Sequence, residues 1–183
     1  RFTPKGIETQ DGTLYDVDVI VTATGFEVIK YLWPTEYIGK DGVSIHDFWS
    51  KDGPRAYLGM MTPNFPNMFM IYGPNSQPVS GGTGLPIWYV IWAAYSAQCI
   101  VRMLEEGHSR VEVKEEAYER YNKALDAEAA KLILLQEEGA PDKNYYVNEF
   151  GRLQVNAPWY GPEYHRMGPP TRTTTSTSSA GSR

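Results

Sequence analysis

Apolar residues form short unbroken runs in the first half of the chain and longer helical patterns in the second half. Residues 19–22 and 68–72 are mainly apolar and do not alternate with polar positions, which is typical of strands that are covered on both faces. We therefore predict two buried strands. The first leads into an Ala-Thr-Gly turn at residues 23–25 and the second into a Gly-Pro-Asn-Ser turn at residues 73–76. Glycine in such turns permits positive φ and a close approach of other backbone or of a cofactor.

The longest apolar segment predicts a helix over residues 86–106. Proline suits the first turn of a helix, and Gly107 is suited to ending one. Two apolar stripes with helical spacing run along it, which indicates a helix that lies in a core. A membrane span is the competing interpretation, but Pro86, Ser96 and Gln98 interrupt the run and Arg102 ends it, so we expect no stable membrane insertion. The stripes are Ile87, Val90, Ile91, Ala94, Val101 and Leu104, and Trp88, Trp92, Tyr95, Cys99 and Met103.

The remaining patterns predict smaller elements and one second helix. Asp11-Gly12 is a strong signal for a tight hairpin turn. Residues 168–183 are rich in Thr, Ser and Gly and lack apolar periodicity, so we predict a disordered tail there. The other predicted elements are hairpin strands at 7–10 and 13–15, a helical turn at 44–50, strands at 57–61 and 110–114, and a helix at 115–138.

Composition and charge narrow the class of function. The chain has 183 residues, a net charge of −5 and no basic block, which argues against nucleic acid or an anionic membrane surface as the main partner. Cys99 is the only cysteine, so no intramolecular disulfide can form, and the chain fits a reducing cytoplasm. Aromatic residues make up 13% of the chain, which predicts large flat side chains in a core or lining a pocket.

The familiar catalytic patterns are not evident in this sequence. His46, His108 and His165 are far apart and lack metal-ligand spacing, so we expect surface or structural roles for them. Cys99 lies in the middle of a predicted helix among aromatic residues, where a buried, unreactive thiol is expected. No Ser-His-Asp set or pair of catalytic carboxylates stands out.

One glycine-rich loop is a local candidate for ligand binding. Residues 80–84 read Ser-Gly-Gly-Thr-Gly and precede the predicted long helix, where free backbone amides and the helix dipole favour an anion or a polar ring edge. The loop begins like a dinucleotide fingerprint, but Ile87 occupies the third glycine position, and about ten residues separate the loop from the preceding strand, whereas a true fingerprint follows its strand directly. A flexible connector and a ligand-binding loop both stay open.

Three segments in this order resemble flavoprotein monooxygenases. The segment DVIVTATGF is similar to the Ala-Thr-Gly region of flavoproteins with two dinucleotide-binding domains. The segment NFPNMFMIYGPNS looks like part of the FAD domain of flavin-containing and Baeyer–Villiger monooxygenases. The C-terminal segments resemble Baeyer–Villiger enzymes, in particular the branch with the aryl-ketone monooxygenases. The matching ranges are 18–26, 64–76, 144–152, 155–159 and 163–164.

This resemblance implies an enzyme that uses FAD and NADPH. In that family the reduced flavin takes up O2 to give a C4a-peroxyflavin, which inserts one oxygen next to the carbonyl of an apolar ketone, while the protein supplies position and polarity. Carried over, the resemblance places cofactor-binding roles on seven residues: Thr24 and Gly25 near the crossing between the two domains, Gly73 and Pro74 in the FAD-domain segment, Gly82 and Thr83 at the flavin pyrimidine edge, and Tyr145 near the nicotinamide ribose. Many family members have a Trp at the position of Tyr145.

The resemblance also predicts what the chain lacks. A complete Gly-x-Gly-x-x-Gly motif and the family's active-site Arg are not found in these 183 residues, and both precede the Ala-Thr-Gly segment in the family. We therefore expect the C-terminal part of such an enzyme, which alone neither holds FAD nor turns over NADPH. The expected fold is α/β, made of incomplete Rossmann-like FAD/NAD(P)-binding domains. Residues 1–25 would end the NADP-binding domain, 26–167 would belong to the FAD-binding domain, and 168–183 would form the tail.

Two alternatives to this function stay open. One is a flavin-containing monooxygenase that oxygenates nitrogen or sulfur instead of a ketone. The other is a non-catalytic interaction module that reuses half of a flavoprotein fold. In that case the aromatic surface of an incomplete domain would bind a partner or aggregate.

Overall fold

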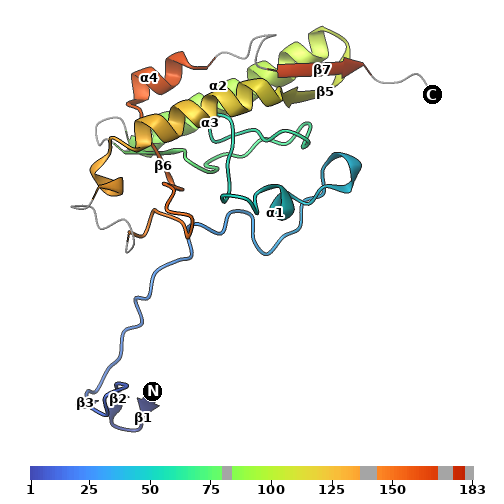
Figure 1. Cartoon of the computed structure of the whole chain (residues 1–183). Helices are drawn as coiled ribbons and strands as arrows, with labels where there is room; N and C mark the ends of the chain where they lie inside the picture. The colour runs from blue at the N-terminus through green and yellow to red at the C-terminus, as the bar shows by residue number, and fades with distance from the viewer. Residues whose placement is uncertain (80–83, 137–143, 169–174, 180–183) are drawn as a thin grey trace.

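The computed structural model describes residues 1–79, 84–136, 144–168 and 175–179. Two long helices, α2 and α3, dominate the larger part of the molecule, and a small sheet at the N-terminus lies well apart from them (Figure 1). The elements are β1 Phe2–Thr3, β2 Gly6–Glu8, β3 Leu14–Asp16, the 3-10 helix Lys40–Gly42, α1 Ile45–Phe48, β4 Gln77–Pro78, α2 Gly84–Glu105, β5 His108–Val113, α3 Glu115–Ala129, the 3-10 helix Ile133–Leu135, β6 Asn156–Ala157, α4 Gly161–Arg166 and β7 Thr175–Ser179.

The N-terminal sheet has the antiparallel order β1-β2-β3. The predicted hairpin around Asp11-Gly12 is confirmed as the connection between β2 and β3. Thr9 and Asp11 shape the turn, because the Asp11 carboxylate accepts hydrogen bonds from the Thr9 hydroxyl at 2.5 Å and from the backbone N–H of Thr13 at 3.1 Å. An extended segment then leads from β3 to the rest of the molecule (Figure 1).

The prediction of a buried strand at residues 19–22 is wrong in this structure. These residues have no regular secondary structure, and the side chains of Val19 and Val21 are 75% and 83% exposed. A strand needs hydrogen-bonding neighbours on its edges, and no strand pairs with this segment among the described residues. The residues are apolar as the pattern indicated, but no other segment of the described chain packs over them.

The predicted strand at residues 68–72 is also irregular, although its central residue is in the core. Met70 is 6% exposed, and its backbone N–H donates to the carbonyl oxygen of Met60 at 2.9 Å. The predicted strand at 57–61 is a tight turn closed by an isolated bridge between Tyr57 and Met61. The run at 57–61 is therefore buried and the run at 68–72 is buried only at its centre, and neither has the backbone conformation of a strand.

The main core lies between α2 and α3 and is largely aromatic. One predicted stripe of α2 faces it, since Trp88 and Trp92 are completely buried. The Trp88 ring lies 4.3 Å from that of Tyr164 in α4, and the indole N–H of Trp92 donates to the Tyr164 hydroxyl at 3.0 Å. The α3 residues of this core are Ala117, Tyr118, Tyr121 and Leu125.

The other stripe of α2, which begins at Ile87, does not lie in the core. Ile87, Val90 and Leu104 are 48%, 66% and 65% exposed, so the expectation of a helix buried on both sides holds for one side only. By length and composition α2 could cross a membrane, but its tryptophan face is packed inside the protein. Only 28% of its most apolar window is buried inside the protein, so α2 is covered on its tryptophan face and exposed on the other.

The ends of two predicted elements differ from the structure. The helix predicted over 115–138 ends at Ala129, and Ile133–Leu135 form a separate 3-10 helix. The prediction of a disordered tail over 168–183 is wrong for Thr175–Ser179, which form β7 and pair antiparallel with β5. Backbone hydrogen bonds to a strand edge do not require apolar side chains, and β-branched Thr is a good strand former.

Candidate functional site

The structure brings the Ala-Thr-Gly turn together with Tyr145, a residue from the opposite end of the chain. The backbone N–H of Phe26 donates to the Tyr145 hydroxyl at 3.3 Å, and the Tyr145 ring lies 3.8 Å from the place where a Cβ on Gly25 would be. Gly25 has φ 81°, a conformation that favours glycine. Thr24 lies beside this contact in the exposed segment. Two of the predicted site segments therefore meet.

The Gly-Pro-Asn-Ser loop is buried against the neighbouring loop at Gly59. The backbone N–H of Gly73 donates to the carbonyl oxygen of Gly59 at 3.2 Å, and a Cβ on Gly73 would collide with that oxygen. Ser76 closes the loop with a hydroxyl bond to the Gly73 carbonyl at 2.6 Å. Gly73 and Pro74 thus set the path of the chain between Tyr72 and β4 through loop packing.

Tyrosines gather where this loop meets the first turns of α2. The Tyr72 hydroxyl donates to Gln77 Oε1 at 2.6 Å, and its ring lies 6.5 Å from that of Tyr89. Burial raises the pKa of Tyr72, and the nearby Tyr89 and Tyr146 raise it further. Tyr145 packs edge-on against Tyr146 at 5.3 Å. We call Tyr72, Tyr89, Tyr145 and Tyr146 the tyrosine edge.

Sequence reasoning singled out only Tyr145 from the tyrosine edge. The signals for the others were the high aromatic content and, for Tyr72 and Tyr146, the matched segments 64–76 and 144–152. Neither signal says which tyrosines meet. Tyr89 is 43% exposed and Tyr145 is 49% exposed, so the edge presents aromatic surface to the outside. Aromatic rings with hydroxyl tips suit a flat ligand that carries polar groups on its rim.

The start of α2 lies next to this edge in the chain, but two predicted residues cannot be placed. Gly82 and Thr83 lie outside the described residues. From Gly84 onward, α2 has no acidic residue in its first turn, so no carboxylate of that turn competes for its amides or opposes a partial negative charge there. The preceding strand β4 pairs in parallel with β6, with Gln77 opposite Asn156.

A buried polar network holds the C-terminal segment against the Gly-Pro-Asn-Ser loop. Asn75, which is 1% exposed, donates from Nδ2 to the carbonyl oxygens of Leu153 at 2.6 Å and Asn156 at 3.2 Å. The backbone N–H of Asn75 donates to the Gln154 carbonyl at 2.9 Å, and the N–H of Gln154 donates to the Tyr146 carbonyl at 2.8 Å. The tyrosine edge therefore has a rigid polar support behind it.

Arg152 is the charged member of this network, and sequence reasoning did not assign it a role. Its side chain is 9% exposed, and Nη2 donates to Asn75 Oδ1 at 2.9 Å. Burial lowers the pKa of Arg152, the neighbouring Arg55 lowers it further, and Asp126 opposes both effects. A buried cation needs such partners, because an unpaired charge away from water is costly.

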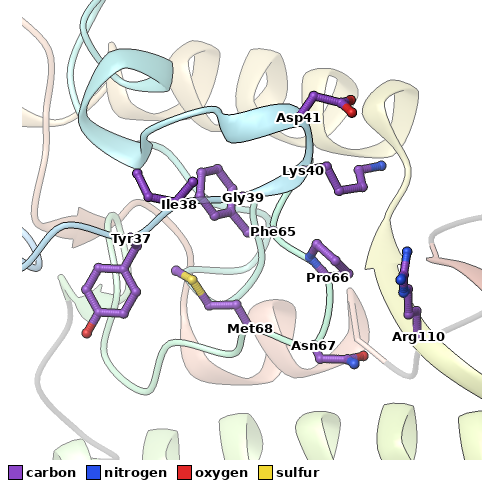
Figure 2. A pocket seen from close by; sticks show the side chains of 10 residues that line it. All are labelled: Tyr37, Ile38, Gly39, Lys40, Asp41, Phe65, Pro66, Asn67, Met68 and Arg110. Carbon is purple, nitrogen blue, oxygen red and sulfur yellow. The ribbon is translucent and has the colours of Figure 1, made fainter.

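A separate hollow of about 800 Å³ lies between the 37–41 and 65–68 loops and β5 (Figure 2). Phe65 and Met68 line it together with Tyr37 and the cations Lys40 and Arg110. Lys40 is paired with Glu112 at 2.9 Å. The Asn67 side chain donates a hydrogen bond to the carbonyl oxygen of Ser109 and accepts one from the backbone N–H of Val111. The hollow shares no lining residue with the tyrosine edge, and none of its lining residues carries a buried polar side-chain atom without a partner.

The described residues contain neither a candidate metal site nor an exposed, reactive thiol. Among those residues no group of three or more His, Cys, Asp and Glu could hold a metal ion. Cys99 is 2% exposed, and burial raises its pKa to about 11, although Tyr95 and Arg102 act in the opposite direction. The thiol is therefore protonated at neutral pH.

Comparison with known proteins shows the family of the chain. It is 30% identical over 168 residues to the uncharacterized monooxygenase y4iD of Sinorhizobium fredii, covering 91% of this chain and 25% of that protein. It is 40% identical over 119 residues to a Baeyer–Villiger monooxygenase of Pseudooceanicola batsensis, covering 64% of this chain and 21% of that enzyme. A crystal structure of OTEMO complexed with FAD and NADP matches 91% of this chain and 30% of its own, with a TM-score of 0.75 and 31% identity.

The chain is a homologue of the Baeyer–Villiger monooxygenases. It matches them over most of its own length but spans less than a third of the length of each relative named above. No protein-family model matches the chain. The resemblance drawn from the three sequence segments is confirmed, and so is the α/β fold class of an FAD/NAD(P)-binding Baeyer–Villiger protein.

Proposed function

We propose that this chain forms part of a monooxygenase that uses FAD and NADPH to insert one atom of O2 next to the carbonyl of a small apolar ketone. The observation that carries the proposal is the meeting of the Gly25 turn with Tyr145 beside the tyrosine edge, in a chain whose structural neighbours include complexes with FAD and NADP. In this proposal residues 1–25 close an NADP-binding domain and residues 26–167 belong to an FAD-binding domain.

The described residues fit the ring end of a flavin. The tyrosine edge offers aromatic surface with hydroxyl tips, and the first turn of α2 offers amides without a competing carboxylate. When bound there, FAD supplies the redox chemistry that activates O2. The N-terminal amides of α2, with Gly82 and Thr83, would support negative charge at the pyrimidine edge. Tyr145 would hold the Ala-Thr-Gly turn in place through its contact with Phe26.

The names of the relatives favour ketone oxidation over oxygenation of nitrogen or sulfur. They include a Baeyer–Villiger monooxygenase and a cyclohexanone 1,2-monooxygenase, and one structural neighbour was solved with ε-caprolactone, the lactone product of such a reaction. We propose a small organic ketone as the substrate, with no nucleic acid partner, in a cytoplasmic protein without stable membrane insertion. The burial of the tryptophan face of α2 supports the last point.

The experiment that tests this function uses the protein that contains this chain, purified with its native cofactor content. We expect Gly82→Val to reduce the FAD bound per protein, because a side chain there would obstruct the close approach of the flavin edge. Gly12→Val is the matched control: at φ 86° it strains the backbone, but a Cβ there meets nothing within 4 Å and the turn lies in the distant N-terminal sheet, so its FAD content should equal that of wild type. Equal FAD content in wild type and Gly82→Val would contradict the assignment of this loop.

Product analysis separates the classes of reaction. With NADPH and O2, a cyclic ketone should give a lactone, whereas a tertiary amine or a sulfide would give an N-oxide or a sulfoxide in the alternative function. Absence of NADPH consumption, of oxygenated product and of bound flavin would favour a non-catalytic module.

A further inference from the structure

A hydrogen-bonded chain of Asp126, Arg152 and Asn75, which we call the relay, links α3 to the segments that carry the tyrosine edge. Arg152 donates from Nη2 to Asn75 Oδ1 at 2.9 Å on one side and from Nε to Asp126 Oδ1 at 3.0 Å on the other. Nη1 donates to the carbonyl oxygen of Pro54 at 3.2 Å. The planar guanidinium thus bridges the Gly-Pro-Asn-Ser loop, the 52–55 turn and α3 at once, a geometry that lysine cannot reproduce.

The backbone of Arg152 fixes a second segment. Its N–H donates to Asn148 Oδ1 at 3.0 Å, and the N–H of Asn148 donates to the carbonyl oxygen of Arg152 at 2.9 Å. Asn148 lies three residues after Tyr145, and Asn75 lies three residues after Tyr72. Tyr72 and Tyr145, which lie on two different segments of the tyrosine edge, are therefore each three residues away from a side chain that bonds to Arg152.

Asp126 provides the charge that keeps this arginine in place. Its carboxylate receives Arg152 on Oδ1 and Arg55 on Oδ2, the latter at 2.8 Å. Without that carboxylate, Arg152 would face the nearby Arg55 as a buried and incompletely paired cation, and such a group either shifts position or attracts water.

We propose that Asp126 is a positioning residue for the flavin-edge site: through Arg152 it holds the Gly-Pro-Asn-Ser loop and the Tyr145 segment in register, although it lies on α3 and is not part of the tyrosine edge. Its role toward the flavin rests on the proposed function. Its role in ordering the two segments is a property of the protein alone and can be measured without flavin.

Asp52 supplies a matched control for this proposal. It also pairs with Arg55, at 2.6 Å, and its side chain is 37% exposed, compared with 39% for Asp126. Among the described residues no hydrogen bond joins the Asp52 carboxylate to Arg152, although its charge opposes the lowering of the Arg152 pKa less strongly than that of Asp126. The backbone carbonyl of Asp52 accepts a hydrogen bond from Asn148. Asp52→Asn therefore removes a carboxylate of the same exposure from the same arginine but leaves the relay intact.

The test compares Asp126→Asn with Asp52→Asn by hydrogen exchange and flavin binding, in the protein that contains this chain. We expect Asp126→Asn to raise exchange at least about tenfold at the amides of Asn75, Asn148 and Gln154, because a charge-assisted contact is lost. Exchange at Val111, which is bonded to Asn67, should stay unchanged. The dissociation constant of FAD should rise, and the visible band of the bound flavin should shift. Asp52→Asn should change each of these quantities much less than Asp126→Asn does.

Two outcomes would overturn the proposal. One is equal changes in both variants, and the other is a rise in exchange throughout the protein, which would mean a general loss of stability. If Asp126→Asn does not fold, Arg152→Lys serves instead and should show the same local pattern. Wild-type protein that binds no FAD would contradict the proposed function, whereas the exchange pattern would still decide the positioning role.

Discussion

At the scale of single residues, the chemistry of several groups depends on neighbours that are distant in the sequence. Tyr145 meets Phe26 across 119 positions, and Arg152 meets Asn75 across 77. The family resemblance suggested a role for Tyr145, but nothing local singled out Arg152 or Asp126. A buried arginine reveals its role only through the groups that compensate its charge.

Cys99 gives a prediction at this scale. Because burial raises the pKa of its thiol to about 11, the reactive thiolate is scarce at neutral pH. We expect iodoacetamide to leave Cys99 unmodified in the native protein and to modify it fully in denaturant, as mass spectrometry of the tryptic peptide would show. Rapid modification of the folded protein at neutral pH would contradict the buried position of this side chain.

At the scale of elements, the long helices were predicted well and the short strands poorly. The predicted 86–106 helix corresponds to Gly84–Glu105, because its apolar stripes and its terminal Gly107 are local signals. The runs at 19–22 and 68–72 did not form strands, since a strand is completed by its neighbours. β7 formed from a polar segment for the same reason: the exposed edge of β5 supplied its partner.

The end of α2 gives a prediction at this scale. Gly107 has φ 69°, and a Cβ there would meet nothing within 4 Å, so Gly107→Ala isolates the backbone cost. We expect the free energy of unfolding to fall by about 1 kcal/mol, measured by urea denaturation. Gly107→Asn should cost less, because Asn tolerates this conformation better. Equal stability of Gly107→Ala and wild type would show that the helix end relaxes freely.

At the scale of the whole molecule, the core is built from aromatic rings that carry hydroxyl groups. Burial raises the pKa of Tyr95, Tyr118, Tyr121 and Tyr164 above the ordinary value of 10.0. The folded state therefore retains protons that the unfolded state releases at high pH. The stability that this provides is complete below the unfolded pKa and is lost as the pH rises through and above it.

Alkaline unfolding tests this property. We expect the free energy of unfolding to decrease steadily above pH of about 10, with several protons released on unfolding, as urea titrations at a series of pH values would measure. Ionisation of the four core tyrosines, followed by tyrosinate absorbance, should coincide with unfolding. If all thirteen tyrosines titrated together while the protein stayed folded, the aromatic core would be more open to water than described.

The sequence by itself determined the elements whose signals are local: the Asp11-Gly12 hairpin, the α2 helix with its buried tryptophan stripe, strand β5, and the motifs that reveal the monooxygenase family. The tertiary structure alone decided which apolar face of α2 is covered and that β7 pairs with β5. It also decided that Gly73 packs against Gly59 and that Asp126, Arg152 and Asn75 form one relay behind the tyrosine edge. Helix periodicity and turn chemistry act between residues a few positions apart, whereas burial, strand pairing and charge compensation depend on partners that only folding brings together.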